Sequence, residues 1–133
     1  MYRHYGQTFN SIVTYIHAQT ISMAEITFDT FLQTDMRTGT ILEAVVFENA
    51  RKPAYQLTID FGSLGIKRSS AQITDHYTPE SLIGQQVIAV VNFPPKQIAN
   101  FFSECLVLGS VDADGKVVLL QPERKMDNGL RIA

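Results

Sequence analysis

Apolar and polar residues alternate strictly along residues 55–61 of the chain. The apolar positions are Tyr55, Leu57, Ile59 and Phe61, and the polar positions between them are Gln56, Thr58 and Asp60. Successive side chains of a strand point to opposite faces, so this period of two predicts a strand with one face in a core and the other in solvent.

Five further segments have the composition of short strands. We expect them over residues 37–47, 66–74, 86–93, 105–108 and 117–120. The first contains Gly39, which permits a bend or a bulge of the kind that closed barrels use. Residues 86–93 are rich in Val and Ile and end at Pro94-Pro95, which predicts a strand buried on both faces. The turn sequence at residues 112–115 predicts a hairpin that leads into residues 117–120.

Two short helices accompany these strands. Thr27 is suited to cap a helix that places Phe28, Phe31 and Leu32 on one face. Residues 78–84 begin with a cap and a proline and end at Gly84, so they predict a single helical turn.

Five strands with one short helix between the third and the fourth follow the order of an oligonucleotide/oligosaccharide-binding (OB) fold. This is an all-β, five-stranded Greek-key barrel, and the turn at residues 112–115 would add a C-terminal hairpin. Composition alone does not exclude another class of small barrel. In an OB fold the ligand lies across strands two and three and is flanked by two loops. Arg51-Lys52, Lys67-Arg68 and Lys96 fall at those places.

The patterned sequence begins after residue 22. Residues 1–22 carry one charged side chain and lack the sustained apolar block of a signal peptide. We expect them to be a poorly ordered extension or an upstream start read in frame, and residues 23–133 to form one domain. An extra helix or strand built on Phe9, Ile12, Val13 and Ile16 is the alternative.

Charge is unevenly spread along a chain whose net charge is -2. Residues 23–50 have a net charge of -4 and residues 51–96 of +2, which argues against a uniformly basic nucleic-acid binder. The single cysteine, Cys105, is consistent with a reducing compartment and with cytoplasmic localisation. No run of apolar residues is long enough for a membrane span. No phosphate-binding glycine loop, metal-ligand spacing or activated nucleophile is recognisable, so we expect no enzyme.

The octapeptide "KRSSAQIT" at residues 67–74 is a candidate binding surface. It lies in a predicted strand, yet it carries two cations and small polar side chains where a core strand would carry Val, Ile or Phe. Ser69, Ser70 and Gln72 offer donors and acceptors to a ligand backbone, and Lys67, Arg68 and Lys96 would line a groove with one sign of charge. Successive side chains alternate in direction, so only one of the two sets can face a ligand. A solvated sheet face is the alternative interpretation.

The loop that begins at Asn92-Phe93-Pro94-Pro95 is the second candidate. If it projects, it exposes Phe93, Ile98, Phe101 and Phe102, and such apolar patches mark partner sites. Burial of the loop in a dimer is the alternative. Asp35 and Arg37 lie two residues apart in extended chain, so we expect an ion pair at the end of the barrel.

Four stretches are shared with a known family: "DMRTGTI" at residues 35–41, "DFG" at 60–62, "VVNFPPK" at 90–96 and "SE" at 103–104. They resemble the tRNA-binding barrel domains appended to methionyl-tRNA and phenylalanyl-tRNA synthetases. The stretches "SSAQIT", "YTPESLIG", "VIAVVNFPP" and "LVLG" resemble a stand-alone branch of that family, the export-related chaperones. The similarity extends from about Ile26 to the C-terminus. The chain departs from the appended domains at Cys105-Leu106, where they usually carry Gly-Met.

The resemblance implies a homodimer of barrels, without cofactor, metal or chemistry, that binds unfolded preproteins and the secretion ATPase. The alternative is structure-specific binding of tRNA or other RNA without a chaperone role. Asn92, Ser103 and Glu104 match positions of the family motifs. Together with the two candidate surfaces, they give the predicted ligand-binding residues: Lys67, Arg68, Ser69, Ser70, Gln72, Asn92, Phe93, Pro94, Lys96, Ser103 and Glu104.

Overall fold

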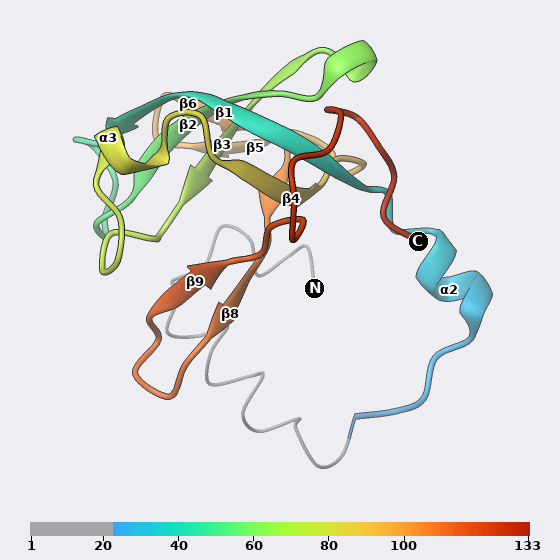
Figure 1. The fold of residues 1–133 in the computed structure, drawn as a ribbon. Helices are drawn as coiled ribbons and strands as arrows, with labels where there is room; N and C mark the ends of the chain where they lie inside the picture. Colours follow the sequence, from blue (N-terminus) through green and yellow to red (C-terminus); the bar gives the residue numbers. More distant parts are fainter. Residues whose placement is uncertain (1–22) are drawn as a thin grey trace.

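The alternating segment at residues 55–61 forms the second strand of a five-stranded antiparallel sheet, which curls into a nearly closed barrel (Figure 1). The computed structural model describes residues 23–133, so the expectations for residues 1–22 lie outside the described residues. The strand order is β3-β2-β1-β4-β7. These strands are β1 (Met36–Val46), β2 (Tyr55–Asp60), β3 (Ile66–Ala71), β4 (Gln86–Val90) and β7 (Leu106–Val107). The predicted all-β OB fold is confirmed.

Strand β1 belongs to both halves of the barrel. Its first part, Met36 to Thr40, pairs with β4, and its second part, Thr40 to Val46, pairs with β2. The register shifts between Ile41 and Glu43, two residues beyond the glycine where a bend was expected. Gly39 is needed for a different reason. A Cβ there would lie 2.7 Å from the Ile59 side chain and from the Phe61 ring, inside the core.

The core fills the barrel and is sealed at one end by the predicted single-turn helix. Inward residues of β1, β2 and β4 form most of it, and the fully buried ones include Ile41, Leu57, Ile59 and Val87. Val117 and Leu119 of the C-terminal hairpin belong to the same core. Helix α3 (Pro79–Leu82) is held by a capping box between Thr78 and Ser81, and its Leu82 is fully buried in the same core. The short helix therefore covers this end of the core.

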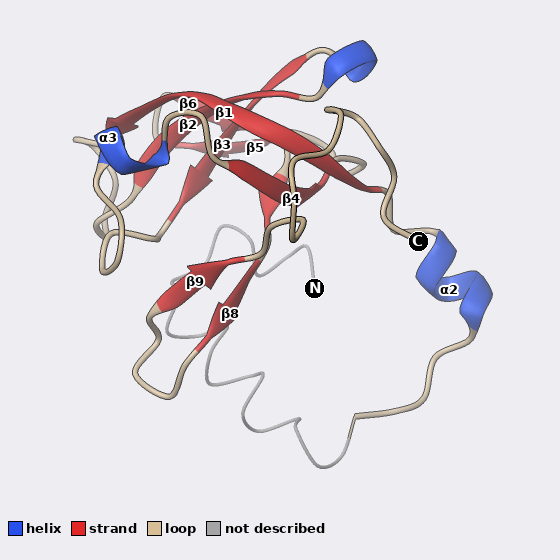
Figure 2. Cartoon of the chain, in the orientation of Figure 1, coloured by secondary structure: helices blue, strands red, loops and turns tan. Residues whose placement is uncertain are grey.

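Two two-stranded hairpins are separate from the main sheet, and the β8–β9 hairpin stands clear of it in Figure 2. The turn at residues 112–115 joins β8 (Gly109–Val111) to β9 (Val117–Leu119) as predicted. The second hairpin, β5 (Lys96–Ile98) with β6 (Phe101–Ser103), was not predicted. A 3-10 turn, η2 (Gly62–Leu64), links β2 to β3. Helix α2 (Phe28–Leu32) is capped by Thr27 as expected and stands away from the barrel, beside the C-terminus (Figure 1). No helix in residues 23–133 is both long and apolar enough to cross a membrane.

Candidate binding face

The polar octapeptide closes the barrel. Strand β3 is an edge of the sheet, and its second side is bonded to residues 103–105 instead of to a continuous ladder. The Arg68 N–H donates to Glu104 Oε1 at 2.9 Å, while the Glu104 N–H donates to the Arg68 carbonyl at 2.8 Å. We call this junction between β3 and residues 103–105 the seam.

Two serine hydroxyls complete the seam. Ser69 Oγ donates to the Cys105 carbonyl at 2.9 Å, and Ser103 Oγ accepts from the Ser70 N–H at 3.0 Å. Both serine residues are almost entirely buried. Backbone groups removed from water need partners, and here side chains supply them. The octapeptide is therefore polar partly because the barrel closes through it, a role that the sequence interpretation did not include.

Pairing with β2 decides which side of β3 faces outward. Ser69 lies opposite Leu57 and Lys67 opposite Ile59, so these two belong to the core side. Arg68 and Ser70 belong to the outer side. The registers across β1, β2 and β3 place two outward rows side by side: Glu43, Thr58 and Arg68 in one, and Val45, Gln56 and Ser70 in the other. We call these six residues the outer face.

An aromatic cluster supports one end of the outer face. Phe101 of β6 is 2% exposed and packs against Phe47, with 5.4 Å between the ring centroids. The Arg68 guanidinium carbon lies 4.3 Å from the centroid of the Phe101 ring. The expectation that Phe101 is exposed was wrong, because residues 96–103 form a hairpin whose inner side packs on Phe47 and Ala54. Its neighbour Phe102 points outward and is 54% exposed.

The other predicted site residues are spread over several surfaces. Lys67 is half-buried on the core side of β3, and Gln72 follows the end of that strand. Lys96 is half-buried on β5 opposite Ser103. Phe93 is half-buried and Pro94 is exposed in the segment between β4 and β5. Because Lys67 and Arg68 occupy opposite sides of one strand, the three expected cations do not share one face.

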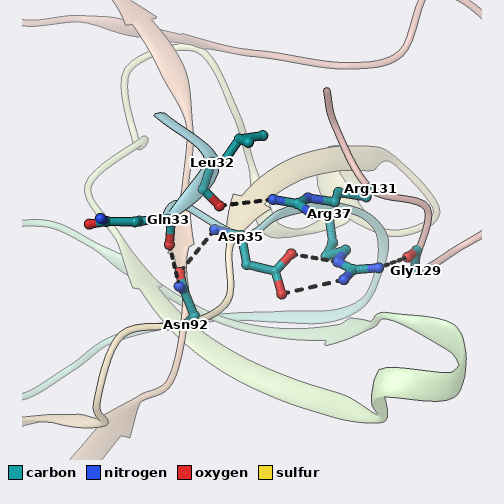
Figure 3. Close-up of polar contacts among 7 residues, drawn as sticks. All are labelled: Leu32, Gln33, Asp35, Arg37, Asn92, Gly129 and Arg131. Carbon is teal, nitrogen blue, oxygen red and sulfur yellow. Dashed lines mark hydrogen bonds and ion pairs between the residues drawn. The ribbon is translucent and has the colours of Figure 1, made fainter. Parts of the chain in front are cut away.

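Asn92 holds helix α2 to the barrel (Figure 3). Its Nδ2 donates to the Gln33 carbonyl at 2.7 Å, and its Oδ1 accepts from the Asp35 N–H at 3.1 Å. The expected ion pair is confirmed beside it, with Arg37 Nε 2.6 Å from Asp35 Oδ1.

The C-terminal segment joins this network from the other side (Figure 3). Arg37 also donates to the Gly129 carbonyl at 3.0 Å, and Arg131 donates to the Leu32 carbonyl at 2.9 Å. Asn92, the helix and the C-terminal residues therefore form one structural unit at this end of the barrel.

An open hollow of about 650 Å³ lies beside the outer face, between β1 and residues 121–128. Gln86 positions this segment, because its side-chain amide donates to the Met126 carbonyl at 2.7 Å and accepts from the Met126 N–H at 3.0 Å. The charged residues around the hollow carry both signs: Asp60, Glu123, Arg124, Lys125 and Asp127. None of the predicted site residues lines it. Its wall comes from residues 121–128, which have no regular apolar pattern, so the hollow could not be predicted from the sequence.

Cys105 is a buried apolar group, as expected. Burial raises the pKa of its thiol to about 12, so the thiol stays protonated and unreactive at neutral pH. His76 is exposed. Within residues 23–133, no group of three or more His, Cys, Asp or Glu side chains is arranged to hold a metal ion.

Comparison with known proteins was made on sequence and on structure. Residues 36–131 match a family model described as putative tRNA binding domain. The chaperone CsaA of Bacillus anthracis is 57% identical, with a TM-score of 0.80, over 83% of this chain and 100% of the other. The CsaA chaperone protein of Picrophilus torridus is 51% identical, with a TM-score of 0.77, over 82% of this chain and 100% of the other.

Synthetases match over a smaller part of their own length. The methionine–tRNA ligase of Parabacteroides distasonis is 36% identical over 107 residues, which are 80% of this chain and 16% of the ligase. The chain thus spans about a sixth of the length of the curated relatives it matches.

Proposed function

We propose that this chain, which belongs to the family of putative tRNA binding domains, is a CsaA-like chaperone. In this proposal its barrel holds unfolded or export-destined polypeptide along its outer face. The resemblance to CsaA and to the synthetase-appended domains, predicted from the sequence, is confirmed.

One observation favours polypeptide over tRNA as the ligand. The similarity to the CsaA chaperones covers the whole of those proteins, whereas the similarity to the ligases covers only 16% of them. A chaperone role requires only the barrel.

The chemistry of the outer face supports the same choice. Its six residues comprise one cation, one carboxylate, three neutral polar groups and one valine that is 50% exposed. Phe102 and Gln97 form the outer side of the neighbouring hairpin. A surface with donors, acceptors and apolar patches suits an extended polypeptide, whereas a phosphate backbone is bound mainly through several cations.

RNA binding is the second candidate because the family model is that of a tRNA-binding domain. Lys67, Lys96 and Arg68 would then contact phosphates from different sides of the seam. Dimerisation would have to bring the cations of two copies together, since each copy has few.

The proposal extends to the state and surroundings of the protein. We place it in the cytoplasm as a homodimer that hands clients to the secretion ATPase, with no cofactor and no catalysis. Residues 23–133 are proposed as the folding unit, so a chain without residues 1–22 should keep a cooperative melting transition.

The test is a salt titration of two ligands, a permanently unfolded model polypeptide and tRNA. For RNA, log affinity should fall by about 0.7 per neutralised phosphate for each log unit of salt, whereas polypeptide affinity should change little. The double variant Lys67→Ala/Lys96→Ala should weaken RNA binding and flatten its salt slope without changing polypeptide binding, and Lys116→Ala/Lys125→Ala is the control. Binding of tRNA alone, with no affinity for the unfolded chain, would contradict the chaperone proposal.

A further inference from the structure

Arg68 is the one outer-face residue whose side chain rests on an aromatic ring. The guanidinium lies 4.3 Å above the Phe101 centroid, within the range of a cation–π contact. Its residue is exposed, whereas Phe101 is buried. One side of the guanidinium is therefore covered by protein, and the remainder of the group is accessible to a ligand.

This arrangement is fixed from three directions. The backbone of Arg68 is bonded through both its N–H and its carbonyl to Glu104. Its strand pairs with Thr58 on the other side. The ring beneath the guanidinium is held against Phe47. An arginine on a surface normally loses rotamer freedom on binding, so a guanidinium already held in place loses less.

The charge of Arg68 is not neutralised by a partner. No carboxylate of residues 23–133 forms an ion pair with it, and Glu43, in the same row, lies two strands away. The five guanidinium N–H donors remain suited to carbonyl oxygens, and its plane to a second aromatic ring.

The surroundings favour a neutral ligand backbone over a polyanion. The row that contains Arg68 also contains Glu43 and the neutral Thr58, so its net charge is zero. A phosphate chain along this row would meet the carboxylate. A polypeptide would gain from the guanidinium donors through its carbonyl oxygens and from the guanidinium plane through an aromatic side chain.

We propose that Arg68, supported by Phe101, is the specificity-determining residue of the outer face, and that it selects aromatic side chains in extended client polypeptides. This inference rests on the proposed function, because it names the chemistry that the same face recognises. The ligand ring stacks on the exposed side of the guanidinium, while adjacent backbone carbonyls accept from its N–H groups.

The test compares two synthetic peptides of extended, otherwise identical sequence, one with a central Phe and one with cyclohexylalanine at that place. The two side chains have similar size and hydrophobicity, but only one has a π face. The parent chain should bind the Phe peptide about three- to tenfold more tightly. Arg68→Met should abolish this preference and Arg68→Lys should reduce it. Arg124→Lys, an exposed arginine paired with Glu123, should keep it.

The comparison of the two peptides on the parent chain needs no variant. It therefore tests the preference for an aromatic side chain even if the Arg68 variants melt at a lower temperature. Equal affinity for the two peptides would overturn the inference and leave the chaperone proposal standing. No affinity for either peptide would overturn both. A preference that persists in a folded Arg68→Met variant would also overturn the inference. The inference would also be overturned if Arg68→Met lost binding of oligouridylate and kept its peptide binding unchanged. The Arg68 guanidinium would then stack on nucleobases and not on client side chains.

Discussion

Glu104 bonds to both backbone groups of Arg68, accepting from its N–H through Oε1 and donating to its carbonyl through its own N–H. Glu104 therefore supplies the central bonds of the seam, in which residues 103–105 take the place of a neighbouring strand at the edge of β3. Glu104 is half-buried as a residue, but its side-chain bond to Arg68 lies at the exposed edge of β3.

Glu104→Ala should lower the free energy of unfolding by about 0.5 to 1.5 kcal/mol, because it removes the side-chain acceptor of the Arg68 N–H at an exposed edge, where water can replace it in part. Glu104→Gln keeps an oxygen at the same place and should lose less. Urea denaturation measures both, and Glu123→Ala, at an exposed glutamate on the C-terminal segment, is the control. If the Glu104→Ala variant were as stable as the parent, the seam would not depend on this side chain.

Asn92→Asp should also destabilise the fold, by about 0.5 to 1.5 kcal/mol, since Asn92 and its hydrogen bonds lie at the surface. The change replaces the amide donor to the Gln33 carbonyl by an oxygen and adds a negative charge near Asp35. The loss should shrink at low pH, where the new carboxyl is protonated and can donate again. Chemical denaturation at two pH values measures it, with Asn100→Asp as the exposed control. Equal stability of the two variants at neutral pH would contradict the structural role of Asn92.

The sequence predicted the long alternating strands, both helix caps and the β8–β9 turn, because each depends on local chemistry. It did not predict the β5–β6 hairpin, whose turn uses Ala99 with φ of 54°, a conformation that alanine rarely adopts. It also could not show that Ser69 and Ser103, separated by 33 residues in the chain, take part in the same seam. The direction of Arg68 followed from its register with Thr58, and pairing partners are not visible in one strand alone.

Stability should fall at alkaline pH because of Cys105. Its pKa is raised from 9.0 to about 12 by burial, so the folded state holds a proton that the unfolded state releases above pH 9. The stabilisation is complete below pH 9 and is lost as the pH rises toward 12. Cys105→Ala should make the melting temperature less dependent on pH in this range. The comparison is made relative to each protein's own melting temperature at neutral pH, which is lower for the variant. A parallel decline in parent and variant would show that other groups dominate.

The proposed dimer should depend on helix α2. Phe28 is 71% exposed and stacks on Phe31 on a helix with no buried residue. Sedimentation at micromolar concentration should give twice the chain mass of 14.9 kDa. Phe28→Asp should shift the protein toward the monomer, because a charge would be buried in the interface. Phe102→Asp, at a similarly exposed ring on the β5–β6 hairpin, should leave the mass unchanged. A monomeric parent would refute the dimer.

The double membership of β1 has a consequence for how the molecule opens. Because one strand pairs with β2 along its second half and with β4 along its first, and all three strands bury side chains in one core, we expect the two halves of the barrel to separate together. Amide hydrogens of β1, β2 and β4 should therefore exchange together, through complete unfolding only. The β8–β9 hairpin packs Val117 and Leu119 into the same core, so it should exchange with the barrel. Helix α2 has no buried residue, and its amides should exchange through smaller openings. The barrel would then open as one cooperative unit, while the outlying helix moves on a faster timescale.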